Sequence, residues 1–93
     1  MYERFIKRIR HLVLERRYIV TLHAYDEMSA DDLSIWDVES ALLNGQIVER
    51  QRDRQTTEHK LRISGMALDD TTIEVIVKFG PTGKLIIITV YKA

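Results

Sequence analysis

The chain has 93 residues, no net formal charge, 45% hydrophobic residues and 30% charged residues, with one Pro and no Cys. This length suits a single domain over residues 1–93, and the composition excludes a disordered or collagen-like chain. The longest apolar run, residues 85–90, is too short to span a membrane. Without Cys there are no disulfides, thiolate catalysis or cysteine-based zinc sites. Because residues 1–7 hold no continuous apolar stretch, we expect no secretory signal and a cytoplasmic protein.

The charges are segregated along the chain although they sum to zero. Residues 1–17 carry a net charge of +4, residues 18–45 a net charge of −6 without any Lys or Arg, and residues 46–63 a net charge of +2. The folded domain can therefore present one basic and one acidic face. The net charge of the whole chain does not favour nucleic-acid binding, but the local basic segments do.

The first 45 residues predict three helices. Apolar side chains recur at helical spacing over residues 2–16, which predicts the first helix. Thr21 can cap a second helix over residues 22–30. Ser34 and Asp37 form the start signal of a third helix, which we expect to end at the glycine at position 45.

From residue 46 the apolar pattern changes to a period of two, which is typical of strands. We expect strands over residues 47–52, 60–67, 72–79 and 85–91. Residues 18–22 are rich in β-branched side chains and suit a short strand or an extended entry. Short connections make neighbouring strands antiparallel, so we predict an α+β fold with N-terminal helices packed on a four-stranded, mainly antiparallel sheet.

Known catalytic motifs are missing from the sequence: there is no phosphate loop, no nucleophile elbow and no two-histidine metal spacing, so we expect neither metal nor cofactor. His23 is the most interesting titratable residue. An imidazole just inside a helix start can donate or accept a proton at cellular pH. Alternatively, His23 only bonds to the backbone and supports packing.

Tyr91 closes the last predicted strand, where simple alternation puts it on one face with Thr89, Ile87 and Leu85. A phenol beside a hydroxyl at a strand end can position or protonate a phosphate oxygen. The alternative is a tyrosine whose ring lies in the core and whose hydroxyl lies at the rim.

Five basic residues span the first predicted strand pair: Arg50, Arg52, Arg54, Lys60 and Arg62. Period two puts the first two on one face, and an antiparallel hairpin could put Lys60 and Arg62 beside them. Such a cluster would hold phosphates and stabilise charge at phosphorus. It could also be ordinary surface charge, because acidic residues of the same segment neutralise part of it.

The sequence resembles a small bacterial and archaeal family catalogued as a domain of unknown function, number 4258. The likeness covers residues 18–91, and its most specific parts are the His-Ala pair at 23–24 and the Thr-Val-Tyr ending at 89–91. Less specific matching segments lie at 27–28, 37–39, 41–42, 44–45, 47–49 and 88.

The resemblance implies a RelE-like (BECR-type) toxin fold, akin to the RelE, BrnT and MqsR toxins. It also implies metal-independent mRNA cleavage, free or on the ribosome, and a cognate antitoxin, commonly one with a YgiT-type zinc finger. His23, Thr89 and Tyr91 match the family pattern, while Lys60 and Arg62 match more loosely the strand-borne cations of related toxins. Glu27 stands where many members have Arg, which makes the site less basic.

We therefore expect a type II toxin that cleaves mRNA, with His23, Lys60, Arg62 and Tyr91 as catalytic residues. RNA-binding roles are expected for a second set: Arg50, Arg52, Arg54 and Thr89. The alternative is a non-catalytic protein- or RNA-binding module of the same fold. Convergence of His23 and the cations on one phosphate site would favour the enzyme, and scatter would favour the module. A homodimer formed through the strand at 47–52 is compatible with both.

Overall fold

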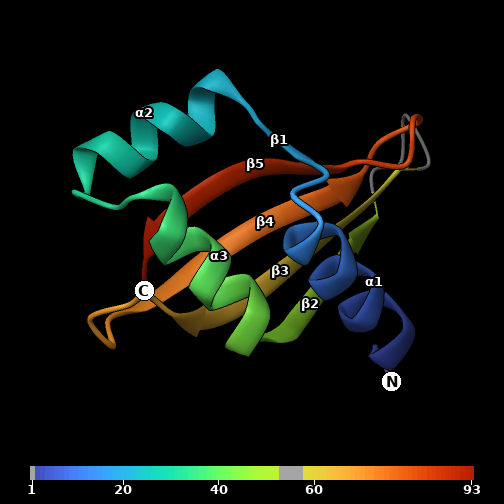
Figure 1. The fold of residues 1–93 in the computed structure, drawn as a ribbon, viewed down its shortest axis with the longest axis horizontal. Helices are drawn as coiled ribbons and strands as arrows, with labels where there is room; N and C mark the ends of the chain where they lie inside the picture. The colour runs from blue at the N-terminus through green and yellow to red at the C-terminus, as the bar shows by residue number, and fades with distance from the viewer. Residues whose placement is uncertain (1, 53–57) are drawn as a thin grey trace.

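The computed structural model describes residues 2–52 and 58–93 (Figure 1). In these residues the chain forms three helices, α1 (Glu3–Leu14), α2 (Leu22–Ala30) and α3 (Ile35–Asn44). It also forms five strands: β1 (Tyr18–Val20), β2 (Gln46–Arg52), β3 (His59–Met66), β4 (Thr72–Phe79) and β5 (Leu85–Lys92). The predicted helices and the four long strands are confirmed to within a few residues at each end.

The strands form one sheet in the order β1-β5-β4-β3-β2. The four long strands pair with one another in antiparallel fashion, whereas β1 pairs with β5 in parallel, with Tyr18 opposite Leu85. The prediction of four strands is therefore wrong by one, because the extended link between α1 and α2 passes beside β5 and pairs with its residues 85–87. The α+β class is confirmed, with three helices on a mixed, mostly antiparallel sheet.

The core lies between the helices and one face of the sheet. In Figure 1, α1 and α3 lie in front of the strands, and α2 lies beside β5 at the margin of the sheet. Fully buried side chains come from both layers: Ile9, Val38, Ala41, Leu42, Leu61, Ile63, Ile73, Val75, Val77, Leu85, Ile87 and Val90. We call the opposite side of the sheet, which α1 and α3 leave uncovered, the open face.

The helix starts follow the capping chemistry that the sequence predicts. The Thr21 hydroxyl accepts a hydrogen bond from the Ala24 N–H at 3.1 Å. Ser34 and Asp37 form a reciprocal capping box at the start of α3. Each cap satisfies helix N–H groups that have no partner within the helix.

Two β-bulges change which residues share a face. Val48 is an extra residue in β2, so that Ile47 pairs with Ile63 while Glu49 pairs with Arg62. Ile88 is an extra residue in β5, where the register shifts by one. A bulge sets two residues against one on the partner strand and so reverses the alternation beyond it.

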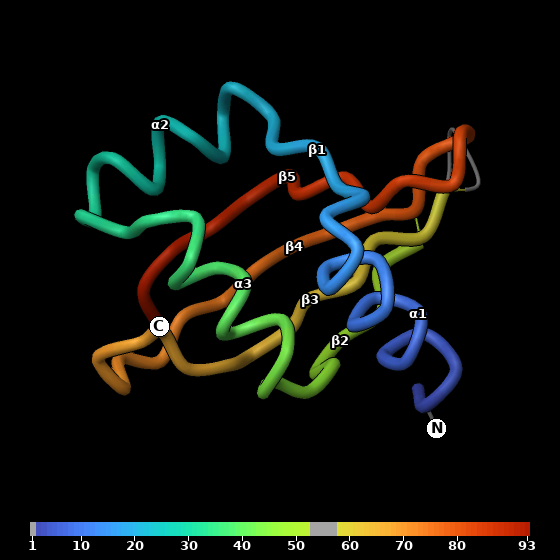
Figure 2. Tube along the Cα trace, in the orientation of Figure 1, coloured from blue at the N-terminus to red at the C-terminus, as the bar shows by residue number. Residues whose placement is uncertain are grey.

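Helix α2 runs along β5 (Figure 2), and side chains of this helix and of its two cap residues supply hydrogen bonds that a further strand would supply to β5. The bonds of Thr21, Glu27 and Asp31 go to the backbone of Ile88, Val90 and Lys92, respectively. Because β1 pairs only with residues 85–87, these side chains satisfy the rest of that edge. They also explain part of the acidic segment before residue 45.

Tyr18 of β1 is tied to α3, since its hydroxyl donates to Glu39 Oε2 at 2.6 Å. Burial, and then this bond to a carboxylate, raise the pKa of Tyr18 to about 12. In an alkaline titration followed by tyrosinate absorbance, we expect one of the four tyrosines to ionise near pH 12 and the Tyr18→Phe variant to lose that step.

The same shift gives a sign for stability. The unfolded chain loses this proton near pH 10 and the folded chain near pH 12, so the stabilisation is complete below pH 10 and is lost between these values. A Tyr18→Phe variant that kept the late ionisation step would contradict the assignment.

Candidate functional site

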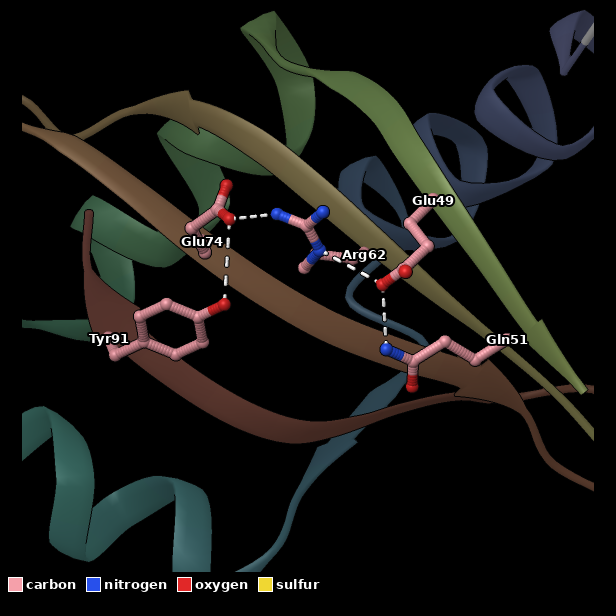
Figure 3. Close-up of polar contacts among 5 residues, drawn as sticks. All are labelled: Glu49, Gln51, Arg62, Glu74 and Tyr91. Atoms are coloured by element: carbon pink, nitrogen blue, oxygen red, sulfur yellow. Dashed lines mark hydrogen bonds and ion pairs between the residues drawn. The ribbon is translucent and has the colours of Figure 1, made fainter. Parts of the chain in front are cut away.

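A polar network crosses the open face from β2 to β5 (Figure 3). Arg62 lies between two carboxylates: its Nε donates to Glu49 Oε1 at 3.2 Å, and its Nη1 donates to Glu74 Oε1. The Tyr91 hydroxyl lies 3.5 Å from Glu74 Oε1, and Gln51 Nε2 donates to Glu49 Oε1 at 2.7 Å. Four strands thus contribute to one connected network.

The network favours the charged forms of Arg62 and Glu49. Bonds to Glu74 and then Glu49 raise the pKa of Arg62. The Gln51 amide and then Arg62 lower the pKa of Glu49. Glu74 is 8% exposed and depends on Arg62 for an ionic partner. A phosphate that bound Arg62 would therefore compete with two carboxylates already in place.

The predicted basic cluster is divided between the two faces of the sheet. Arg50 pairs with Leu61 and Arg52 with His59, whereas Lys60 pairs with Gln51 on the side of Arg62. The expectation that Arg50 and Arg52 lie beside Lys60 and Arg62 is wrong, because the bulge at Val48 shifts the register by one residue. Arg54 lies outside the described residues.

Arg50 instead makes contacts on the helix side. Its Nε donates to His59 Nδ1 at 3.3 Å, and its guanidinium lies 5.4 Å from the centre of the Phe5 ring. Arg8 of α1 stacks over Phe79 at 4.1 Å in the same way. These cation–π contacts form a basic surface at α1 that is separate from the open face.

Thr89 and Tyr91 share the open face, where they pair with Ile76 and Glu74. The expectation that Leu85 and Ile87 lie on the same face is wrong. Both are fully buried under the helices, because the bulge at Ile88 reverses the alternation between them and Thr89.

His23 lies on the first turn of α2 and is 67% exposed in its side chain. Its Nε2 is 3.1 Å from Glu27 Oε1, and the same oxygen accepts a hydrogen bond from the Val90 N–H at 3.2 Å. One carboxylate therefore joins the imidazole to β5, between Thr89 and Tyr91 in sequence. With Nε2 directed at Glu27, Nδ1 is the ring nitrogen that points away from this contact.

Sequence reasoning missed the role of Glu27, which it interpreted only as a loss of positive charge. The available signal was the spacing, because residues four apart on a helix are neighbours. His23 and Glu27 have this spacing within α2. A carboxylate that holds one ring nitrogen orients the other, as in catalytic triads.

The structure thus connects His23, through Glu27, to the backbone of Val90 in β5, the strand that carries Thr89 and Tyr91 on the open face. Tyr91 is joined through Glu74 to Arg62 on β3, and Arg50 and Arg52 lie elsewhere. Within residues 2–52 and 58–93, no group of three or more acidic or histidine side chains is arranged to hold a metal ion. Among the same residues no helix is both long and apolar enough to cross a membrane.

The fold and the site define a class of protein. It is an α+β protein with helices on one face of a mixed sheet and charged side chains across the other face. Within that class, the chain belongs to the family of the domain of unknown function DUF4258, whose model matches residues 20–92. The family resemblance is confirmed by this match. Searches of curated proteins and of solved structures find no match to the chain.

Proposed function

We propose that the chain is the toxin of a type II toxin–antitoxin pair, with a RelE-like fold, and that it cleaves mRNA without a metal ion. The observation that carries this proposal is the hydrogen-bonded link from His23 through Glu27 to Val90. This link sets an oriented imidazole beside the strand that bears Thr89 and Tyr91, although the two segments are more than 60 residues apart in sequence.

In the proposed reaction, His23 Nδ1 removes the proton from the RNA 2′-hydroxyl while the 2′ oxygen attacks the adjacent phosphorus. The bond from phosphorus to the 5′ oxygen breaks, and that oxygen takes a proton from Tyr91 or from protonated His23. The products are a 2′,3′-cyclic phosphate and a free 5′-hydroxyl. Glu27 holds the imidazole in the tautomer that the first step needs.

The cations have different parts in this proposal. Lys60 and Arg62 face the same side as Thr89 and Tyr91, where they can stabilise charge at phosphorus. Arg62 must first exchange a carboxylate for the phosphate. Arg50, Arg52 and Arg54 would hold the RNA strand further from the reaction. A cognate antitoxin would neutralise the toxin. The family resemblance implies an antitoxin with a YgiT-type zinc finger.

A second candidate function, a non-catalytic protein- or RNA-binding module, is favoured by a different observation. The basic residues are divided between the two faces, and Arg62 is paired on both sides. Such scatter suits a surface that binds without reacting.

The two functions are separated by incubating the purified chain with end-labelled RNA in the presence of EDTA. We expect cleavage, with 2′,3′-cyclic phosphate ends that resist a polynucleotide kinase lacking its phosphatase activity. Intact RNA together with a shifted band in a native gel would contradict the toxin and support the module. Intact RNA without a shift would contradict both RNA-directed functions.

A further inference from the structure

An apolar groove lies on the outer surface of α3. This helix buries Val38, Ala41 and Leu42 against the sheet. Trp36, Ser40 and Leu43 follow each other at helical spacing and form a second stripe, of which Leu43 also packs against the core. With Leu68, from the connection between β3 and β4, they line an open groove of about 500 Å³. Trp36 is 63% exposed and Leu68 is 67% exposed.

Hydrogen bonds hold the two walls of the groove in place. The Ser40 hydroxyl and the Asn44 amide both donate to the Met66 carbonyl, at 2.9 and 3.0 Å. On the other side, Asp37 Oδ1 accepts from the Leu68 N–H at 3.1 Å. The groove is thus shaped before any partner arrives, which lowers the entropic cost of binding.

Three of the charged residues around the groove are acidic. Glu39 is part of its lining, Asp37 bonds to the backbone of Leu68, and Asp69 is the next residue. Hydrogen bonds from Ser34 and from Thr71 lower the pKa of Asp37 and of Asp69, respectively, so both carboxylates are ionised at neutral pH. Lys92, at the end of β5, interacts with Asp69 and offsets one of these charges.

We propose that this groove docks a cationic amphipathic segment of a protein partner. Its apolar side chains would cover Trp36 and Leu68, and its Lys or Arg side chains would face the carboxylates of Asp37, Glu39 and Asp69. Apolar anchors within a charged rim are the usual composition of a binding site for a helix. The groove lies on the helix side of the sheet, so the docked segment leaves the open face uncovered. Docking at this groove does not depend on RNA cleavage.

Trp36 is the single tryptophan of the chain and reports directly on this surface. The probe is a designed helical peptide of Leu and Lys, about 18 residues long so that it can form a helix. A second peptide, with Glu in place of Lys, has the same apolar face and the opposite charge. We expect the cationic peptide to shift Trp36 emission to shorter wavelength and to bind roughly tenfold or more tightly than the acidic one, with the difference reduced by salt.

Two serine variants locate the binding. Leu68→Ser should weaken the cationic peptide about tenfold, because it removes an exposed apolar anchor. Leu14→Ser is the matched control: Leu14 is 70% exposed on α1, outside the groove, and its loss should leave binding unchanged. Both positions are on the surface, so both variants should fold.

Three results would overturn the proposal. Equal binding of the two peptides would show apolar adsorption without charge selection. Equal binding by the Leu68→Ser variant and the native chain would place the peptide elsewhere. Trp36 emission that shifts with protein concentration alone, together with a dimer in sedimentation, would make a second copy of the chain the occupant.

Discussion

Replacement of His23 by Ala should lower the rate of RNA cleavage by roughly 10²–10⁴-fold, the usual contribution of a general acid or base. The imidazole is 67% exposed, so the side chain is not needed for packing, and the variant should fold with unchanged stability. The measurement is the single-turnover rate of cleavage in EDTA, with circular dichroism to compare the folds. In a bacterial host, the same substitution should convert growth arrest on induction into growth.

The chain contains a matched control for this experiment. His11 on α1 and Glu15, the cap residue that follows this helix, form a pair of the same i,i+4 spacing, with a His11 Nε2 to Glu15 Oε1 distance of 2.9 Å, and the exposure of His11 is similar to that of His23. His11→Ala should therefore leave the rate unchanged. Glu27→Gln keeps an acceptor for Val90 and His23 but removes the charge, so we expect a smaller fall in kcat with little change in KM. Full cleavage by the His23→Ala variant would remove this residue from the mechanism.

Replacement of Gly65 by Ala should destabilise the fold by about 3 kcal/mol, through overpacking against backbone. A Cβ atom at this position would lie 2.8 Å from the Ala41 Cα and closer still to its carbonyl oxygen. These are backbone atoms of α3, so no side-chain rotation relieves the clash. The measurement is urea unfolding, in which the midpoint should fall while the slope stays unchanged.

Gly80→Ala is the control for the loss of a glycine. Its Cβ would lie 2.9 Å from the end of the Ile86 side chain, a methyl group that can move, and 3.2 Å from the Lys84 carbonyl oxygen, which is a milder contact than those at Gly65. We expect a change below about 1 kcal/mol at this position. If Gly65→Ala were as mild as Gly80→Ala, the close packing of α3 on β3 would be wrong.

The bounds of the helices and strands could be predicted from local sequence patterns. Which residues lie on the same face of the sheet could not be predicted in this way. Caps at Thr21 and Ser34 and the alternation in residues 72–79 are local signals, and each of them is present in the structure. Bulges at Val48 and Ile88 depend on how two distant strands pair, and single-strand periodicity carries no trace of them.

The bulge at Val48 explains why the predicted cluster of basic residues is wrong. Without the extra residue, continued pairing from Ile47 and Ile63 would set Arg50 opposite Lys60, which is the expected cluster of like charges. With the extra residue, Glu49 lies opposite Arg62, and these two side chains form an ion pair. Opposite charges across strands stabilise a sheet and like charges destabilise it. The observed register therefore agrees with the pairing of charges between strands, which the alternation of apolar residues does not describe.

The way that α2 satisfies the backbone of β5 also limits how copies of the chain can assemble. On that side the sheet offers only the three residues of β1 and the side-chain bonds of α2, a poor template for another strand. The outer edge of β2 is seven residues long, and within residues 2–52 and 58–93 no strand pairs with it. Because only the β2 edge is suited to pair with another strand, one copy of the chain can bind one other copy through it. The β2 edges of both copies are then occupied. Growth by strand addition would stop at two copies instead of continuing into a fibre.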